Sequence, residues 1–406
     1  MAIFASWVNE SGGICERLLA CGVQDLPEDP DDAEDFGFTA EDIGDYFFDV
    51  LESYGRTYAD IEFISGDNAS VNGRLADLLQ SWLREKRGIN RVIPLIGCAS
   101  HRLNLAVQSL YAEGTDFYNA VNKVNSLMVE LGSLKNTFKL RVKTSLCVIK
   151  RNDTRWGSTF AMLKRYLDLQ PVLPQCSFKR DCKDKFLTVP ENRLINELAD
   201  VLHKCERVSI FLQTNDAHKV NLLSVRIAFD DLIAEIPELE SKLGPNAAVV
   251  HNPQFENAIV KLQKGEELST NEKRVLSVFK CGAEVQSEGD EERLSYEERL
   301  LRRVEESKTP SNKRNASFRN TFHVSPTSNI VERLFSRAGL VMRPHRRSMD
   351  PSTLEMLLLL RFNKDLWAEK TLQGIIDRKK RENQERARQR REEEALKRLA
   401  DELAVV

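Results

Sequence analysis

The sequence lacks long hydrophobic runs, a cysteine framework and a strong charge of either sign. No segment approaches the roughly 18 uninterrupted apolar residues of a membrane span, so we expect no membrane partner. The 8 cysteines are scattered over 406 residues without framework spacing, which indicates reduced thiols inside a cell. The formal net charge of -3 gives the whole chain no nucleic-acid-binding signature, although a local basic surface can still bind phosphate.

A secretory signal and an internal repeat are also absent. The N-terminal stretch Met1–Trp7 has no basic flank and Glu10 follows it closely, which favours a strand over a signal peptide. No repeat of solenoid type occurs. The composition, with 41% hydrophobic and 30% charged residues, is typical of a soluble globular protein with one large core or about two to three ordinary ones.

The first part of the chain alternates strands with helices. Apolar runs at 2–8 and 14–21 flank a Gly-containing turn and predict a β-hairpin. The later elements follow at short intervals: a helix capped by Thr39, a strand ending at Asp67, a helix over 70–86, a strand over 92–96 and a helix from Ser100. This order predicts an α/β layer sandwich with a mixed sheet.

The remainder of the chain is dominated by helical patterns, interrupted by one charged stretch that is poor in apolar residues. We therefore divide the chain into five segments: 1–112, an α/β core; 113–281, a helical insertion; 282–317, a flexible linker; 318–368, a second helical region; and 369–406, a charged helical tail.

Two acidic residues are candidates for a catalytic or metal-binding role. Asp67 ends the run Ile-Glu-Phe-Ile-Ser-Gly-Asp-Asn, in which a buried strand places a carboxylate at the tip of a sheet. Glu332 lies on a helix that we expect to start near Ser328, with Val331, Leu334 and Phe335 facing inward. Taken alone, a Gly-Asp step after a strand is more often a turn or a helix cap, and a single helical Glu is usually a surface residue.

An ordered set of five motifs changes the interpretation of these acids. The motifs are Asp67-Asn68-Ala69, the Cys-Ala-Ser-His-Arg-Leu-Asn-Leu run at 98–105, Arg155-Trp156, the Glu-Arg-Leu-Phe-Ser-Arg-Ala-Gly run at 332–339, and the Asn-Lys-Asp-Leu-Trp run at 363–367. Together they span about 60–367, and the chain resembles the core of a hAT-superfamily DNA transposase. The Leu-x-Pro element of that family departs slightly, as Met349-Asp350-Pro351.

The resemblance implies an RNase H-like fold whose three acids hold two Mg²⁺ ions for strand cleavage. Asp67 corresponds to the second acid and Glu332 to the third. The family's first Asp lies on a strand just before the one that resembles Ala2–Val8, and the sequence has no counterpart of it, nor the cysteine pair of a BED-type zinc finger. We therefore expect an incomplete RNase H-like mixed sheet and a catalytically inactive remnant, with no cofactor and only weak metal binding by Asp67 and Glu332.

The resemblance also implies contacts with DNA, each of which has a simpler alternative. Cys98 and His101 correspond to residues that organise the active site and flanking DNA, but a core thiol and a hydrogen-bonded histidine fit equally well. Arg155 and Trp156 lie in a basic stretch, where the ring can stack on a flipped base or pack between helices.

Two further groups complete the candidate site. Arg346 and Arg347 belong to a short basic cluster that contacts phosphate or is an ordinary solvated loop. The helix that follows is apolar nearly all round, so it is buried in the chain's own core or, as the resemblance implies, in a dimer. The candidate dimerisation residues are Leu357, Leu358, Leu360, Phe362, Leu366 and Trp367.

The sequence thus predicts a transposase-derived nuclear protein that has lost catalysis but retains homodimerisation and weak, non-specific DNA binding through 141–165. No small-molecule substrate is expected. Two alternatives stay open: an active DDE-type transposase whose first Asp comes from an upstream exon, and a domesticated interaction module that only dimerises.

Overall fold

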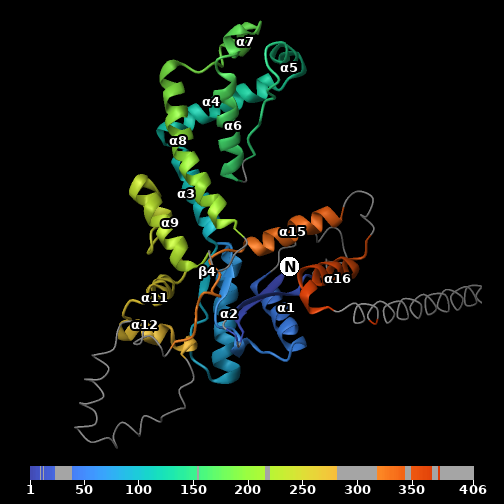
Figure 1. Ribbon diagram of the computed structural model, residues 1–406, viewed down its shortest axis with the longest axis vertical. Helices are drawn as coiled ribbons and strands as arrows, with labels where there is room; N and C mark the ends of the chain where they lie inside the picture. Colours follow the sequence, from blue (N-terminus) through green and yellow to red (C-terminus); the bar gives the residue numbers. More distant parts are fainter. Residues whose placement is uncertain are drawn as a thin grey trace, which may run out of the picture. The chain divides into compact units, whose positions relative to one another are not determined.

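The computed structural model describes residues 1–9, 11, 13–22, 39–152, 155–214, 220–280, 318–342, 349–367 and 374 (Figure 1). The described part is mixed α/β and mostly helical with small sheets, which confirms the coarse fold class. The predicted linker, almost all of the charged tail, and the candidate residues Arg346 and Arg347 lie outside the described residues.

The chain forms two compact units. The large unit comprises residues 6–16 and 26–333, and the small unit comprises residues 1–5, 17–25 and 334–406. The predicted α/β core and helical insertion therefore fall mainly in the same unit, whereas the C-terminal helices share theirs with residues from the chain's beginning.

The α/β part of the large unit is built on one short parallel strand pair. Strand β3 (Ile64–Gly66) pairs with β4 (Leu95–Gly97), with Ile64 opposite Leu95. Helices α1 (Ala40–Ser53) and α2 (Ser70–Arg87) pack on each other beside this pair. Their local core consists of Tyr58, Leu75, Leu79, Leu83 and Ile93.

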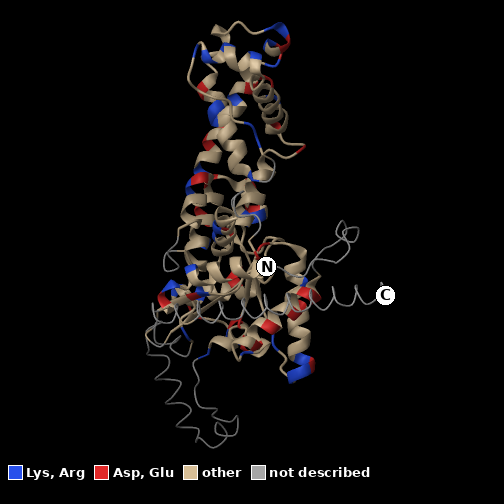
Figure 2. Ribbon diagram, turned by 90° about the vertical axis from the view of Figure 1, so that its right-hand side faces the viewer, with Lys and Arg blue, Asp and Glu red and all other residues tan. Residues whose placement is uncertain are grey.

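All secondary structure described between residues 116 and 279 is helical, as predicted. Helices α3, α4 and α6 pack against the long α8, and α9 packs against α11 (Figure 1). In Figure 2, acidic and basic positions are scattered along these helices, as expected of solvated faces around an apolar core. The bounds are α3 Ala99–Leu110, α4 Asp116–Leu131, α5 Leu134–Arg141, α6 Trp156–Leu169, α7 Arg180–Lys183, α8 Val189–Leu212, α9 Leu222–Glu235, α10 Glu240–Leu243, α11 Pro253–Lys264 and α12 Thr270–Val275.

The N-terminal strands β1 (Ile3–Val8) and β2 (Ile14–Ala20) form a two-stranded sheet, which confirms the predicted hairpin. Two C-terminal helices are described, α15 (Asn329–Val341) and α16 (Pro351–Phe362). In the small unit, the core is formed by Leu18, Leu334 and Leu358, with Phe4, Leu354 and Phe362 packed around them.

The predicted single mixed sheet is not formed by the described strands, which make two separate two-stranded sheets. Both strands of the parallel pair are shorter than their apolar runs. A 3-10 turn at Tyr58–Asp60, closed by hydrogen bonds between Thr57 and Asp60, precedes β3, and the strand begins only at Ile64. Strand β4 begins only after Pro94, which has no N–H to donate to a neighbouring strand.

Candidate functional site

The parallel strand pair ends where the first two motifs begin. Asp67 follows β3 and Cys98 follows β4, and the Cys98 N–H donates a hydrogen bond to the Gly66 carbonyl at 2.7 Å. A side chain at Gly97 would collide with the amide of Asn68, so glycine lets the two motifs pack closely. The carboxyl ends of parallel strands are the usual position of ligand-binding side chains in α/β proteins.

Asp67 is exposed and begins the turn into α2. Its Oδ1 accepts hydrogen bonds from the Ala69 N–H at 3.1 Å and from Asn72 Nδ2 at 2.7 Å. These contacts are those of an Asx turn, the structural role that a Gly-Asp step most often has. One carboxylate oxygen therefore serves the local fold, while Oδ2 has no hydrogen bond within the described residues.

Polar side chains without hydrogen bonds surround the same strand ends. Ser65 Oγ, Ser100 Oγ and both polar atoms of the Asn68 amide are buried and unpaired within the described part of the chain. A buried polar group left unpaired costs about 1–3 kcal/mol, so such atoms call for a partner such as an ordered water, an ion or a ligand. The three side chains come from β3, from the loop after it and from the first turn of α3.

The segment that leads into α15 is fastened to the beginning of α3. The Ser328 N–H donates to Cys98 Sγ at 3.3 Å, and the Ala99 N–H donates to the Pro326 carbonyl at 2.9 Å. The side chain of Asn329 donates to the Leu212 carbonyl at the end of α8, at 2.8 Å. These contacts bring the first turn of α15, and with it Glu332, to the motif at 98–105.

Two contacts join the Arg-Trp motif to its neighbours in space. Arg155 Nη2 lies 2.9 Å from Glu332 Oε2, in an exposed ion pair. The backbone N–H of Trp156 donates a hydrogen bond to Asn104 Oδ1 at 3.1 Å. Within the large unit, the structure thus brings together residues of four motifs, with Glu332 representing the fourth. Asn104 was not among the predicted site residues, although it lies within the quoted run 98–105.

Three of the residues predicted to contact DNA, Trp156, Cys98 and His101, are buried or half-buried. Trp156 is only 6% exposed and packs against Phe160, with ring centroids 6.1 Å apart. This burial fits the helix-packing alternative, because base stacking would require the ring to leave the core. Cys98 is buried, as expected of a core thiol, and His101 is half-buried on the first turn of α3.

The surroundings of Asp67 and Glu332 determine whether these two acids can bind magnesium. Their oxygens are the donors that Mg²⁺ prefers. However, the guanidinium of Arg155 already neutralises Glu332, and Asp67 is partly engaged in its turn. This arrangement does not fit a pair of magnesium ions. Within the described ranges, no three His, Cys, Asp or Glu side chains gather as a metal site.

In the small unit, α16 turns one side of its apolar surface inward. Leu358 is buried, and the Phe362 ring packs edge-on against Phe4 at 5.9 Å. Leu360 and Trp367 are half-buried, whereas Leu357 and Leu366 are exposed. The chain's own core therefore takes part of the predicted dimerisation surface. On α15, Leu334 is buried as expected, but Phe335, expected inward, is about half exposed at 49%.

The fold and site define a class of protein: mixed α/β, with a polar cluster at the ends of a parallel strand pair and a large helical region. A search found no match among protein-family models or curated proteins. None of the helices in the described part is both long and apolar enough to cross a bilayer.

Proposed function

We propose that the chain is a hAT-transposase-like nuclear protein with an incomplete RNase H-like core, which binds DNA and self-associates but does not cleave DNA strands. The observation that carries the proposal is the meeting of Asp67, Cys98, Arg155 and Glu332 motifs around the ends of β3 and β4. These motifs are far apart in the sequence and follow the order of the transposase family. Motifs arising by chance have no reason to converge on one site.

The ion pair between Arg155 and Glu332, which engages one of the two candidate acids, supports the lack of strand cleavage. A carboxylate neutralised by a guanidinium is a poor magnesium ligand, and the two-metal reaction needs several free carboxylates. We expect no magnesium-dependent nicking of supercoiled plasmid by the purified chain beyond that of Glu332→Gln. Nicking that requires magnesium and disappears in Glu332→Gln would refute this part of the proposal and support an active transposase.

DNA binding is supported by the basic stretch between α5 and α6. Lys143 and Lys150 are exposed there, and neither forms an ion pair with a carboxylate of the described chain. Arg155, at the end of this stretch, is also exposed. Exposed basic side chains are suited to phosphate contact without base recognition.

The test is the salt dependence of binding to a short DNA duplex, measured by fluorescence anisotropy. Each phosphate contact contributes a slope of about -0.9 to the plot of log affinity against log salt. We expect Lys143→Ala with Lys150→Ala to flatten the slope by about 2 and to weaken binding regardless of DNA sequence. Lys273→Ala, an exposed lysine on α12, is the matched control. An unchanged slope in the double variant would leave a dimerisation module as the better reading.

A further inference from the structure

Helix α5 carries an apolar ridge that the described residues of the large unit leave exposed. Leu134, Phe138 and Val142 are 92%, 73% and 68% exposed. Their spacing of four residues places them on one side of the helix and its C-cap. Single exposed apolar residues are normal on protein surfaces, but three large ones in a row are typical of an interaction site. We call these three residues the α5 ridge.

The surroundings of the α5 ridge are basic. Residues 133–143 contain four basic side chains and no acidic one: Lys135, Lys139, Arg141 and Lys143. In Figure 2, blue Lys and Arg positions, with red acidic positions beside them, lie at the end of the helices that carries α5 and α7 in Figure 1. A partner that covers the apolar ridge would therefore meet positive charge on both sides of it.

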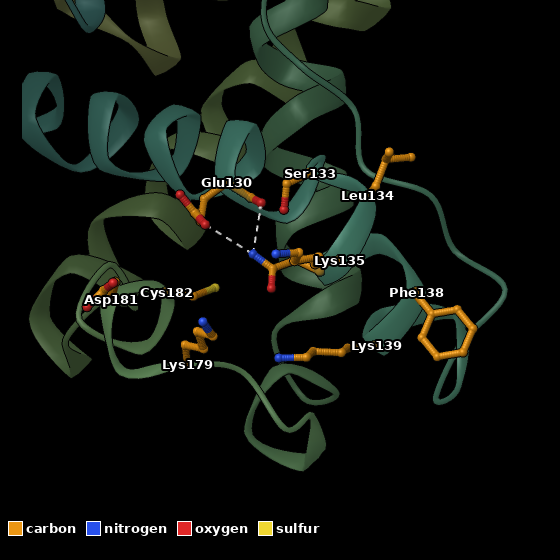
Figure 3. Close-up of a pocket in the computed structure, with 10 residues that line it drawn as sticks. Glu130, Ser133, Leu134, Lys135, Phe138, Lys139, Lys179, Asp181 and Cys182 are labelled. Atoms are coloured by element: carbon orange, nitrogen blue, oxygen red, sulfur yellow. Dashed lines mark hydrogen bonds between the residues drawn. The ribbon is translucent and has the colours of Figure 1, made fainter.

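A hollow of about 640 Å³ between α4, α5 and α7 adjoins the ridge. Figure 3 shows the ammonium ends of Lys139 and Lys179 in this hollow, with Phe138 and Leu134 projecting apart from them. Neither lysine forms an ion pair within the described residues. Glu130 in its wall is already engaged, by Lys185 at 3.0 Å and by the Asn136 amide at 3.1 Å. Asp181 is the remaining acid of the lining, so the positive charge dominates.

We infer that the α5 ridge binds an acidic amphipathic helix of a partner protein. The apolar side of that helix packs on Leu134, Phe138 and Val142, and its carboxylates pair with the flanking lysines, one of them in the hollow between Lys139 and Lys179. A helical partner presents side chains at the same four-residue spacing, so the two rows can interdigitate. This interaction shares Lys143 with the DNA-binding proposal, but its tests below change neither Lys143 nor Lys150.

The composition of the ridge favours a helix over a single-stranded nucleic acid. Nucleic-acid sites of that kind stack successive bases on aromatic rings. Two of the three ridge residues, Leu134 and Val142, are aliphatic and offer no ring to stack on. They are suited to leucine or isoleucine side chains instead.

The experiment uses the full chain and a fluorescently labelled synthetic peptide of about four helical turns. The peptide carries leucine at every fourth position with glutamates between, and a scrambled peptide of the same composition is the comparison. Anisotropy should show saturable binding of the first peptide only. Phe138→Ser and Lys139→Glu should each weaken it about tenfold or more, as expected for central contacts.

Matched controls are Ile210→Ser, an exposed apolar residue on α8, and Lys273→Glu, an exposed lysine on α12. Both should bind as the unmodified chain does. Because Phe138 is exposed, its variant should keep the circular dichroism spectrum, so lost binding reports the ridge. Equal binding of the scrambled peptide, or unchanged binding by the ridge variants, would overturn the inference. So would ridge-dependent binding of oligothymidylate or phosphatidylserine vesicles without binding of the peptide.

Discussion

At the scale of single residues, the least expected feature is an ion pair inside the large unit. Arg102 Nη1 lies 2.9 Å from Glu256 Oε2, and the two side chains are 4% and 8% exposed. Burial raises the pKa of the Glu256 carboxyl above its ordinary value, against the opposing charge of Arg102. Arg102 lies on α3 and Glu256 on α11, so the pair links two helices that are distant in sequence.

Breaking this pair should destabilise the large unit strongly. Arg102→Met leaves a buried carboxylate without its partner, and Glu256→Leu leaves a buried guanidinium. Each is expected to lower the free energy of unfolding by about 3–5 kcal/mol. The double variant removes both charges and should recover most of the loss. Urea denaturation of the four proteins measures this. A double variant as unstable as the sum of the single ones would contradict it.

A second charged group predicts a pH dependence. Burial acts to raise the pKa of the Glu62 carboxyl, but hydrogen bonds from His323 and Arg319 outweigh it and hold that pKa below its ordinary value. A depressed carboxyl pKa contributes stability above the unfolded value, about 4.3, and this contribution is lost as pH falls through the folded pKa.

Glu62→Gln should therefore lower stability by about 1–3 kcal/mol at neutral pH and much less below about pH 4. Thermal unfolding across that pH range measures the difference. Glu41→Gln, on the first turn of α1 and exposed, is the control. Parallel stability curves for Glu62→Gln and the unmodified chain would show that the carboxylate has no such role.

At the scale of elements, helix ends were predictable because their signals are local. Thr39 and Asp42 form the expected capping box of α1: the Asp42 N–H donates to Thr39 Oγ1 at 3.1 Å, and the Thr39 N–H donates to Asp42 Oδ2 at 2.9 Å. The strands were predicted less well, because a turn at 58–60 and Pro94 limit pairing in ways that an apolar run does not reveal.

The cap of α1 can be tested directly. Thr39→Ala should lower stability by about 1 kcal/mol, because the N–H of Asp42 loses its acceptor. Thr39→Ser keeps the hydroxyl and should change little. Chemical denaturation compares the two variants. Equal losses in both would mean that the threonine methyl group, and not the hydrogen bond, stabilises this helix end.

At the scale of the whole molecule, sequence motifs named several residues of the candidate site but not how these residues meet. The order of the motifs was enough to assign Asp67, Cys98 and Glu332 to one candidate site. The pairing of Arg155 with Glu332 and the burial of Trp156 did not, since both depend on how helices distant in sequence pack. The same limit applies to α16, whose all-round apolar pattern does not say which side its own core covers.

Self-association is the prediction that belongs to this scale. Leu357 and Leu366 remain exposed in the small unit at 41% and 56%, and a dimer would bury them. Leu357→Glu with Leu366→Glu should weaken a homodimer about tenfold or more, as charges placed in an apolar interface do. Sedimentation equilibrium measures the change, and Ile210→Glu in the large unit is the control. A monomeric unmodified chain at every accessible concentration would remove the pairing proposal.

The side chain of Asn363 has a consequence for how the protein is made. Its amide donates to the Leu18 carbonyl at 2.8 Å and accepts from the Leu18 N–H at 3.2 Å. These two hydrogen bonds satisfy the backbone polar groups of Leu18 in β2. A growing polypeptide leaves the ribosome from its amino end, so this strand emerges long before its partner is translated. The small unit can close only after Asn363 has been translated, and until then the backbone groups of Leu18 lack this partner.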